Sequence, residues 1–226
     1  MIIFKKVILN NLINKIKKLL KYSVPPIFSI IYYKFKNISH NTLFDGDDEM
    51  FKRIIKTTKL YGEYGCGKST NWVLKNSKID ILSVDTSSLW VQKTLDINHQ
   101  NKNRLKIKHI DFGEVGESGY PINYNKIENI NYYGEWIWKH YKKPDMVLID
   151  GRFRVFCFLT SLKYAEEGTN IIFDDYIFRH NYHYVEKYLK RTEVLGRQCL
   201  FIVPSKDKID MKSLEQDINH FKFVMN

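Results

Sequence analysis

Short, almost wholly apolar segments alternate with amphipathic segments along most of this sequence. The segments 146–149 and 170–173 contain a single polar residue, and the interval between them at 155–166 has the pattern of a helix. Strands that are buried on both faces form continuous apolar runs, and strands that alternate with helices pair in parallel. The sequence therefore predicts an α/β fold, with a mostly parallel sheet and helices on both faces.

The remaining elements are predicted from the same apolar periods. We expect a helix to begin at Asp45–Asp48, because Phe51, Ile54 and Ile55 then share one face. Further helices are expected at 70–76, 89–97 and 127–141, and further strands at 60–64, 80–84, 105–110 and 200–203.

The N-terminal residues differ in character from the rest. Apolar residues between Leu9 and Leu20 share one helical stripe, lysines and asparagines occupy the other side, and Pro25-Pro26 ends the helix. We predict a basic amphipathic helical extension at 1–44 and a catalytic domain at 45–226. The stripe packs on its own domain or lies on an anionic membrane surface, and both alternatives stay open.

The formal net charge of +11 favours an anionic partner, such as nucleic acid, a membrane surface or a phosphorylated substrate. A general bias toward lysine, asparagine and isoleucine explains the charge equally well, and no Lys/Arg run has nucleic-acid-binding length. We therefore expect no nucleic-acid partner. The three cysteines form no disulfide or metal pattern, and neither a transmembrane segment nor a secretory signal is present. These features predict a cytoplasmic protein, with peripheral contact at the inner face of the membrane left open.

A glycine-rich turn, Glu63-Tyr64-Gly65-Cys66-Gly67, follows the first strand of the predicted domain. Ligands of open α/β sheets bind beyond the carboxyl ends of the strands, where glycines let backbone N–H groups approach them. Asp85 ends the next strand about twenty residues later, where an acid accepts hydrogen bonds from ribose hydroxyls. The turn and this acid predict a Rossmann-like sheet that binds a nucleoside.

The same stretch also satisfies the phosphate-loop pattern GxxxxGK(S/T), through Gly62, Gly67, Lys68 and Ser69. This pattern favours an alternative function, ATP- or GTP-dependent phosphoryl transfer, in which Asp150 would hold magnesium. A carboxylate at Glu63 disfavours it, because that charge would lie beside triphosphate oxygens. Asp85 also disfavours it, since a phosphate loop needs no acid at the second strand end.

Three strand ends resemble those of class I S-adenosylmethionine-dependent methyltransferases. Glu63-x-Gly65-x-Gly67 is similar to the first motif of that superfamily, Ser83–Thr86 to its acidic second strand end, and His109–Phe112 to its third. The resemblance implies S-adenosylmethionine as the cofactor, with Glu63 near its ammonium group and Asp85 on its ribose. Lys68 would pair with its carboxylate. The implied cofactor-binding residues are Glu63, Gly65, Gly67, Lys68, Ser69, Asp85, Thr86, Asp111 and Phe112, the last two at the adenine.

More narrowly, the sequence resembles small bacterial methyltransferase-like proteins of surface-polysaccharide gene clusters. The resemblance lies in Tyr64–Thr70, Ser83–Asp85, Gly119–Pro121 and Asp150–Arg154. It implies a role in polysaccharide biosynthesis and a glycan-linked or nucleotide-linked acceptor.

The fourth and fifth strands end in three carboxylates, Asp150, Asp174 and Asp175. They resemble the divalent-metal site of catechol-type O-methyltransferases, in which a metal lowers the acceptor pKa, although that family usually has Asp-Asn at the second place. The resemblance implies a Mg²⁺ site on these three residues. The alternative is that Asp174 caps the following helix and only Asp150 faces the acceptor.

The acceptor site is predicted around the same strand ends. Arg152 and Arg154 suit bidentate contact with a phosphate or carboxylate, or they neutralise the aspartates. A base is needed when the acceptor is a hydroxyl, and a histidine titrates near working pH. We predict an enzyme that O-methylates a polar or phosphorylated small molecule or a glycan-linked or nucleotide-linked precursor. Its predicted catalytic residues are Asp150, His180 and Asp175, and its predicted acceptor-binding residues are Tyr120, Arg152, Arg154, Tyr176 and Arg179.

Overall fold

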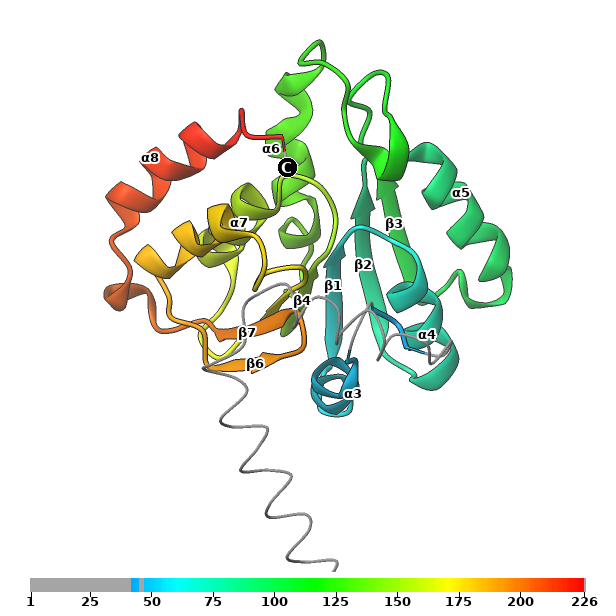
Figure 1. Ribbon diagram of the computed structural model, residues 1–226. Coiled ribbons are helices and arrows are strands. Elements are labelled where there is room, and N and C mark those ends of the chain that lie inside the picture. The colour runs from blue at the N-terminus through cyan, green and yellow to red at the C-terminus, as the bar shows by residue number, and fades with distance from the viewer. Residues whose placement is uncertain (1–41, 45–46, 226) are drawn as a thin grey trace, which may run out of the picture. The chain divides into compact units, whose positions relative to one another are not determined.

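The computed structural model describes residues 42–44 and 47–225 of the chain, and the larger of its two compact units spans Asp47–Asn226. The N-terminal helix that we predict lies outside the described residues, as do residues 45 and 46 at the predicted start of the domain. Figure 1 shows the larger unit as a central sheet between two groups of helices.

The sheet has seven strands in the order β3-β2-β1-β4-β5-β7-β6. Strands β1 to β5 are parallel, and β7 runs antiparallel to both β5 and β6. The strands are β1 (Leu60–Tyr64), β2 (Asp80–Asp85), β3 (Leu105–His109), β4 (Met146–Ile149), β5 (Asn170–Phe173), β6 (Glu193–Leu195) and β7 (Gln198–Ile202). This arrangement confirms the predicted Rossmann-like, mostly parallel sheet.

Helices cover both faces of the sheet, with α4 and α5 beside β2 and β3 and with α6, α7 and α8 on the other side (Figure 1). The α-helices are α3 (Glu49–Ile55), α4 (Lys68–Asn76), α5 (Ser88–Ile97), α6 (Ile130–Glu135), α7 (Arg154–Tyr164) and α8 (Met211–Phe221). Short 3₁₀ helices are η1 (His99–Asn101), η2 (Glu117–Gly119), η3 (Ile127–Asn129), η4 (Trp136–Trp138), η5 (His180–Lys187) and η6 (Lys206–Lys208).

The helix predicted at 127–141 is broken into η3, α6 and η4. The tighter last turn buries Trp138, whose indole Nε1 donates a hydrogen bond to the Tyr64 hydroxyl at 2.9 Å. Tertiary packing thus overrides the continuous helical period. We did not predict β6 or α8, because β6 has three residues and α8 buries only Leu214 and Ile218.

Helix α7 is apolar around most of its circumference from Val155 to Leu162, and every residue of that stretch is buried. It packs against β4 and β5 on one side and against α8 and η5 on the other. A helix that is enclosed in this way holds its first turn rigidly. The residues 150–154 that join β4 to α7 are therefore fixed at the carboxyl edge of the sheet.

Candidate active site

Two glycine turns meet at the carboxyl edge of the sheet. Gly65 has a φ of +95°, and a Cβ on it would lie 2.7 Å from the Gly151 amide nitrogen. A Cβ on Gly151 would in turn lie 2.9 Å from the Gly65 nitrogen and 2.6 Å from the Tyr133 hydroxyl. Because neither turn has room for a side chain, the turn after β1 and the turn after β4 pack backbone against backbone. Asp150 is thereby held next to the glycine-rich turn.

Gly67 has different surroundings, because a Cβ built on it meets no atom within 4 Å. Its amide donates a hydrogen bond to the Thr70 hydroxyl at 2.9 Å at the start of α4. The backbone of the turn is therefore open on this side, as a closely approaching ligand requires.

Glu63 lies beneath the turn and is fully buried. One carboxylate oxygen accepts hydrogen bonds from the hydroxyls of Tyr61 and Ser69, both at 2.8 Å, and the other accepts one from Thr70. Burial raises the pKa of the Glu63 carboxyl, and these hydroxyls oppose that effect. The side chain thus ties β1 to the first turn of α4. Its predicted contact with the cofactor ammonium group stays a prediction.

Asp85 lies at the end of β2 and is 8% exposed. One carboxylate oxygen accepts a hydrogen bond from the Cys66 amide at 2.8 Å, and the other accepts one from the Ser87 amide at 2.7 Å. Burial raises the pKa of this carboxyl, while the two amides and the nearby Arg152 lower it. Each oxygen keeps a lone pair beyond its amide partner, as a ribose contact needs.

The loop between β3 and α6 arches over the ends of β2 and β4. The Thr86 hydroxyl donates a hydrogen bond to the Gly119 carbonyl at 2.6 Å, and the Arg152 Nε donates one to the Ser118 carbonyl at 3.1 Å. The Arg152 guanidinium also lies over the Tyr120 ring, 6.0 Å from its centroid. Thr86 therefore anchors this loop through its side chain, whereas Arg152 and Tyr120 lie together at its edge.

The two residues predicted at the adenine have different environments, one exposed and one buried. Asp111 is exposed and pairs with Lys126, which lowers the pKa of its carboxyl. Phe112 is only 2% exposed and packs against Tyr133 and Phe153, with centroids 5.7 and 5.1 Å away. The Phe112 ring thus lies among the core residues beneath the site, and its predicted contact with the adenine stays a prediction.

The three carboxylates at the ends of β4 and β5 lie close together, and each forms an ion pair with at least one arginine. Arg154 Nη2 lies 3.0 Å from Asp150 Oδ1, and Arg197 Nη2 lies 2.5 Å from Asp174 Oδ2. Asp175 pairs with Arg197 at 3.0 Å and with Arg179 at 3.0 Å.

The structure therefore does not support the predicted magnesium site. The arginines saturate two of the three carboxylates and would repel a divalent cation. No group of three metal-ligating side chains occurs anywhere in the described part of the chain. Asp175 is held by the same pairing, and its predicted catalytic role stays a prediction. Asp174 caps no helix, because its carboxylate binds Arg197 and Gln198.

Asp150 differs from its neighbours, because its side chain is 33% exposed and its Oδ1 is the oxygen that Arg154 binds. Burial, followed by the negative charge of Asp174, raises the pKa of Asp150, and the cations of Arg154 and Arg197 oppose this rise. A partly exposed carboxylate with a raised pKa can take up a proton.

The predicted acceptor residues are only partly brought together. Arg154 is 4% exposed and Tyr176 fully buried, which disfavours a direct contact with an acceptor, and their predicted role stays a prediction. Arg179 is exposed but holds Asp175. His180 is exposed on η5 with its ring against His183, and no described contact links it to Asp150. Arg152 and Tyr120 remain at the mouth of the site.

The phosphate-loop alternative is wrong on structural grounds. Gly62 lies within the buried strand β1, where a Cβ would meet the Pro144 ring at 2.8 Å. Only Gly65–Gly67 separate β1 from α4, so no loop of the length that cradles phosphates is present. The Ser69 hydroxyl binds Glu63 and not the open side of the turn, and Lys68 is exposed to solvent.

Sequence reasoning missed Gly151 and Arg197. A signal for Gly151 was present, since a glycine directly after a buried strand marks a close approach. Arg197 lies far from Asp174 in the sequence and carried no such signal.

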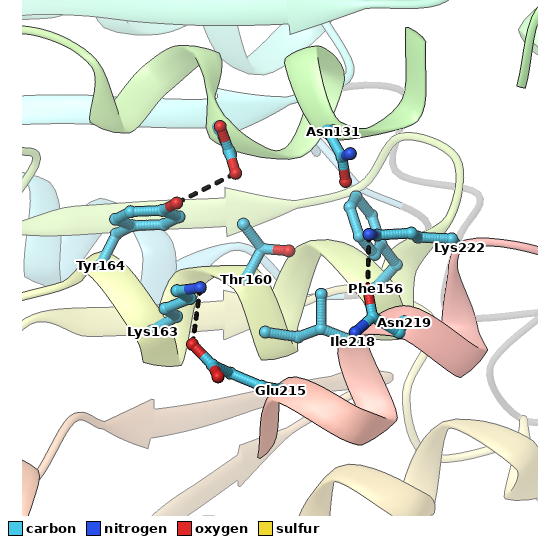
Figure 2. Close-up of a pocket in the computed structure, with 10 residues that line it drawn as sticks. Asn131, Phe156, Thr160, Lys163, Tyr164, Glu215, Ile218, Asn219 and Lys222 are labelled. Atoms are coloured by element: carbon cyan, nitrogen blue, oxygen red, sulfur yellow. Dashed lines mark hydrogen bonds and ion pairs between the residues drawn. The ribbon is translucent and has the colours of Figure 1, made fainter. Parts of the chain in front are cut away.

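A cavity of about 270 Å³ lies between α6, α7 and α8 (Figure 2). Its charged groups are already paired, with Lys163 and Glu215 2.9 Å apart and Lys222 bound to Asn219 at 2.6 Å. None of its lining residues belongs to the strand ends or to the glycine turns. We therefore place the functional site at the carboxyl edge of the sheet.

Solved structures resemble this chain to different degrees. A methyltransferase-like protein of Silicibacter pomeroyi is 28% identical, with a TM-score of 0.69 over 77% of this chain and 92% of that protein. An S-adenosylhomocysteine-bound methyltransferase of Podospora anserina is 12% identical, with a TM-score of 0.48 over 87% of this chain and 96% of the other. A putative caffeoyl-CoA O-methyltransferase of Staphylococcus aureus is 14% identical, with a TM-score of 0.45 over 84% and 98%. No family model and no curated protein matches the sequence.

The strand order and the glycine turn beside Asp85, together with the Silicibacter pomeroyi structure, define a class of protein. The chain has the Rossmann-like fold of methyltransferases. Among the described residues, no helix is long and apolar enough to cross a membrane.

Proposed function

We propose that this protein is an S-adenosylmethionine-dependent methyltransferase that transfers the methyl group to an oxygen atom of a polar acceptor. The observation that carries the proposal is the joining of Asp85 to the glycine turn, through the Cys66 amide at 2.8 Å. This bond supports the proposal, because an acid that could accept ribose hydroxyls lies directly beside an open backbone.

The residues at the site fit the donor. The open face of Gly67 admits the methionine part, and Asp85 binds the ribose through its remaining lone pairs. When bound, S-adenosylmethionine supplies an electrophilic methyl group on a sulfonium, and the protein aligns it with the acceptor. Asp150 follows β4 beside the glycine turn, and its carboxylate accepts the proton of the acceptor hydroxyl.

We further propose that the acceptor carries a phosphate or carboxylate, as a phosphorylated small molecule or a glycan-linked or nucleotide-linked precursor does. Arg152 supports this. Of its guanidinium nitrogens only Nε donates a hydrogen bond to a described residue, which leaves the Nη groups for an anion. The resemblance to proteins of polysaccharide gene clusters supports a precursor of surface glycans. We place the reaction in the cytoplasm, with the N-terminal residues as a peripheral membrane contact.

Thermal unfolding with added nucleosides tests the proposal. S-adenosylhomocysteine should raise the melting temperature and Mg-ATP should not, because a ligand stabilises only a protein that binds it in the folded state. Asp85→Asn should weaken S-adenosylhomocysteine binding, whereas Asp80→Asn, at the exposed opposite end of β2, should leave it unchanged. Stabilisation by Mg-ATP alone would refute the proposal.

A further inference from the structure

The loop between β3 and α6 contains a small hairpin, residues 114–122. Val115 and Pro121 form an isolated antiparallel bridge, and the Ile122 amide donates a hydrogen bond to the Glu114 carbonyl at 3.1 Å. Among the described residues, the backbone–backbone hydrogen bonds of the 114–122 hairpin stay within it. A displacement of this hairpin would therefore break no hydrogen bond of the main sheet.

The tip of the 114–122 hairpin lies against the two residues that follow Asp85. Gly119 has a φ of +74°, and a Cβ on it would lie 2.6 Å from the Thr86 hydroxyl and 3.3 Å from the Ser87 Cβ. The Thr86 hydroxyl donates a hydrogen bond to the Gly119 carbonyl at 2.6 Å, and the Ser87 amide donates one to the Asp85 carboxylate at 2.7 Å. A nucleoside held by Asp85 would therefore lie next to the hairpin tip.

The tip also contacts the acceptor side of the site. The Arg152 Nε donates a hydrogen bond to the Ser118 carbonyl at 3.1 Å, and the Arg152 guanidinium lies over the Tyr120 ring. The hairpin thus lies between Thr86 on the donor side and Arg152 on the acceptor side. One movement of the hairpin would change access to both.

Two tyrosines join this loop to the C-terminal residues, which lie beside α6 (Figure 1). The Tyr120 hydroxyl donates a hydrogen bond to the Met225 carbonyl at 3.1 Å, and the hydroxyl of Tyr124, just after the hairpin, donates one to the Phe223 carbonyl at 2.9 Å. Both hydrogen bonds are exposed to solvent. Exposed hydrogen bonds of this kind break and re-form while the rest of the fold stays intact. We call residues 223–225 the C-terminal latch.

The latch has its own attachment to the domain through α8. The Phe223 amide donates a hydrogen bond to the His220 carbonyl at 3.3 Å, and the Val224 amide donates one to the Phe221 carbonyl at 3.2 Å. Helix α8 in turn packs against α7. The latch therefore stays with α8 when the hairpin moves.

We propose that the 114–122 hairpin is a gate beside the donor site and that the C-terminal latch holds it closed through Tyr120 and Tyr124. This inference rests on the proposed function. The latch contacts are made whether or not a donor is bound, because the donor lies on the Thr86 side of the hairpin. Loss of one contact therefore increases the open population by the same factor in the free protein and in the complex. The ligand then enters and leaves faster by that factor, and its Kd stays the same.

Surface plasmon resonance with immobilised protein and S-adenosylhomocysteine measures both rate constants. We expect Tyr124→Phe to raise the association and dissociation rate constants alike, by about three- to tenfold, as the loss of one hydrogen bond predicts. The Kd should not change, whereas loss of a direct ligand contact would raise it. Tyr141→Phe is the matched control, because Tyr141 is fully exposed, and it should keep both wild-type rate constants.

Removal of the chain after Lys222 deletes both carbonyl acceptors and spares Leu214 and Ile218, which α8 buries. The shortened protein should exchange S-adenosylhomocysteine at least as fast as Tyr124→Phe does. Tyr124→Phe in the shortened protein should add no further change, because the hydroxyl has already lost its partner. A merely structural role of Tyr124 would add its full effect in both backgrounds. Tyr120→Phe provides a second, independent test of the same kind.

Wild-type rate constants in both folded tyrosine variants overturn the inference. A rise in the dissociation rate constant alone, or a full effect of Tyr124→Phe in the shortened protein, overturns it as well. If the wild type does not bind S-adenosylhomocysteine, the proposed function fails and the gate fails with it. If the wild type binds it and neither tyrosine affects the rates, only the gate is lost.

Discussion

Substitution of Gly65 by alanine tests whether the two glycine turns determine the geometry of the site. The new Cβ would lie 2.7 Å from the Gly151 nitrogen, 2.8 Å from its Cα and 3.0 Å from the Asp150 carbonyl carbon, all backbone atoms that no rotamer change can move. The residue would also keep a φ of +95°, which an alanine rarely adopts. Strain costs about 1–2 kcal/mol and overpacking about 1–3 kcal/mol, so we expect a loss of about 2–5 kcal/mol.

Two further glycines calibrate that estimate. Gly151→Ala has a comparable clash, at 2.6 Å from the Tyr133 hydroxyl, without a positive φ, so it should cost about 1–3 kcal/mol. Gly116→Ala meets its nearest atom at 3.8 Å and should change stability by less than about 0.5 kcal/mol. The expected order of destabilisation is therefore Gly65, Gly151 and then Gly116.

Urea unfolding followed by circular dichroism measures all three variants. With a slope of about 2 kcal/mol per molar urea, Gly65→Ala should lower the midpoint by about 1–2.5 M. The displaced turn should also weaken S-adenosylhomocysteine binding, because Cys66 would no longer reach Asp85. A Gly65→Ala protein as stable as Gly116→Ala would refute the reasoning.

Further predictions concern single groups of the site. Folding raises the pKa of Glu63 above 4.5, so the contribution of this group to stability is complete below pH 4.5 and is lost as the pH rises through the folded pKa. Glu63→Gln should therefore flatten that part of a plot of melting temperature against pH. Parallel curves for the variant and the wild type would contradict this. Asp85→Asn should weaken the binding of S-adenosylhomocysteine about 10- to 100-fold in calorimetry, since charge-assisted hydrogen bonds are lost. An affinity equal to that of the wild type would show that Asp85 does not bind the ribose. Lys68→Ala should keep most donor affinity, because Lys68 is exposed at the start of α4, and a complete loss would show that it binds the methionine carboxylate. Excess chelator should leave the melting temperature and donor binding unchanged, because the carboxylates of Asp174 and Asp175 form ion pairs with arginine. A protein that lost stability or donor binding in chelator would restore the metal hypothesis.

The sequence by itself determined the sheet and the location of the site. Apolar runs and helical periods are local patterns, and they place the parallel strands within one or two residues of their observed bounds. Because parallel strands end at one edge, the glycine turn, Asp85 and Asp150 had to meet there. The broken helix at 127–138 departs from its pattern because Trp138 is drawn into the core.

Only the tertiary structure decided what each side chain at that edge contacts. The sequence places Asp150, Asp174 and Asp175 together, but it does not show that Arg197 reaches them from the antiparallel hairpin. It likewise does not show that Glu63 lies beneath the turn or that the Phe112 ring lies in the core. The physical reason is that periodicity reports which face of an element is buried, whereas the partner of a charge or ring depends on elements distant in the chain that pack against it.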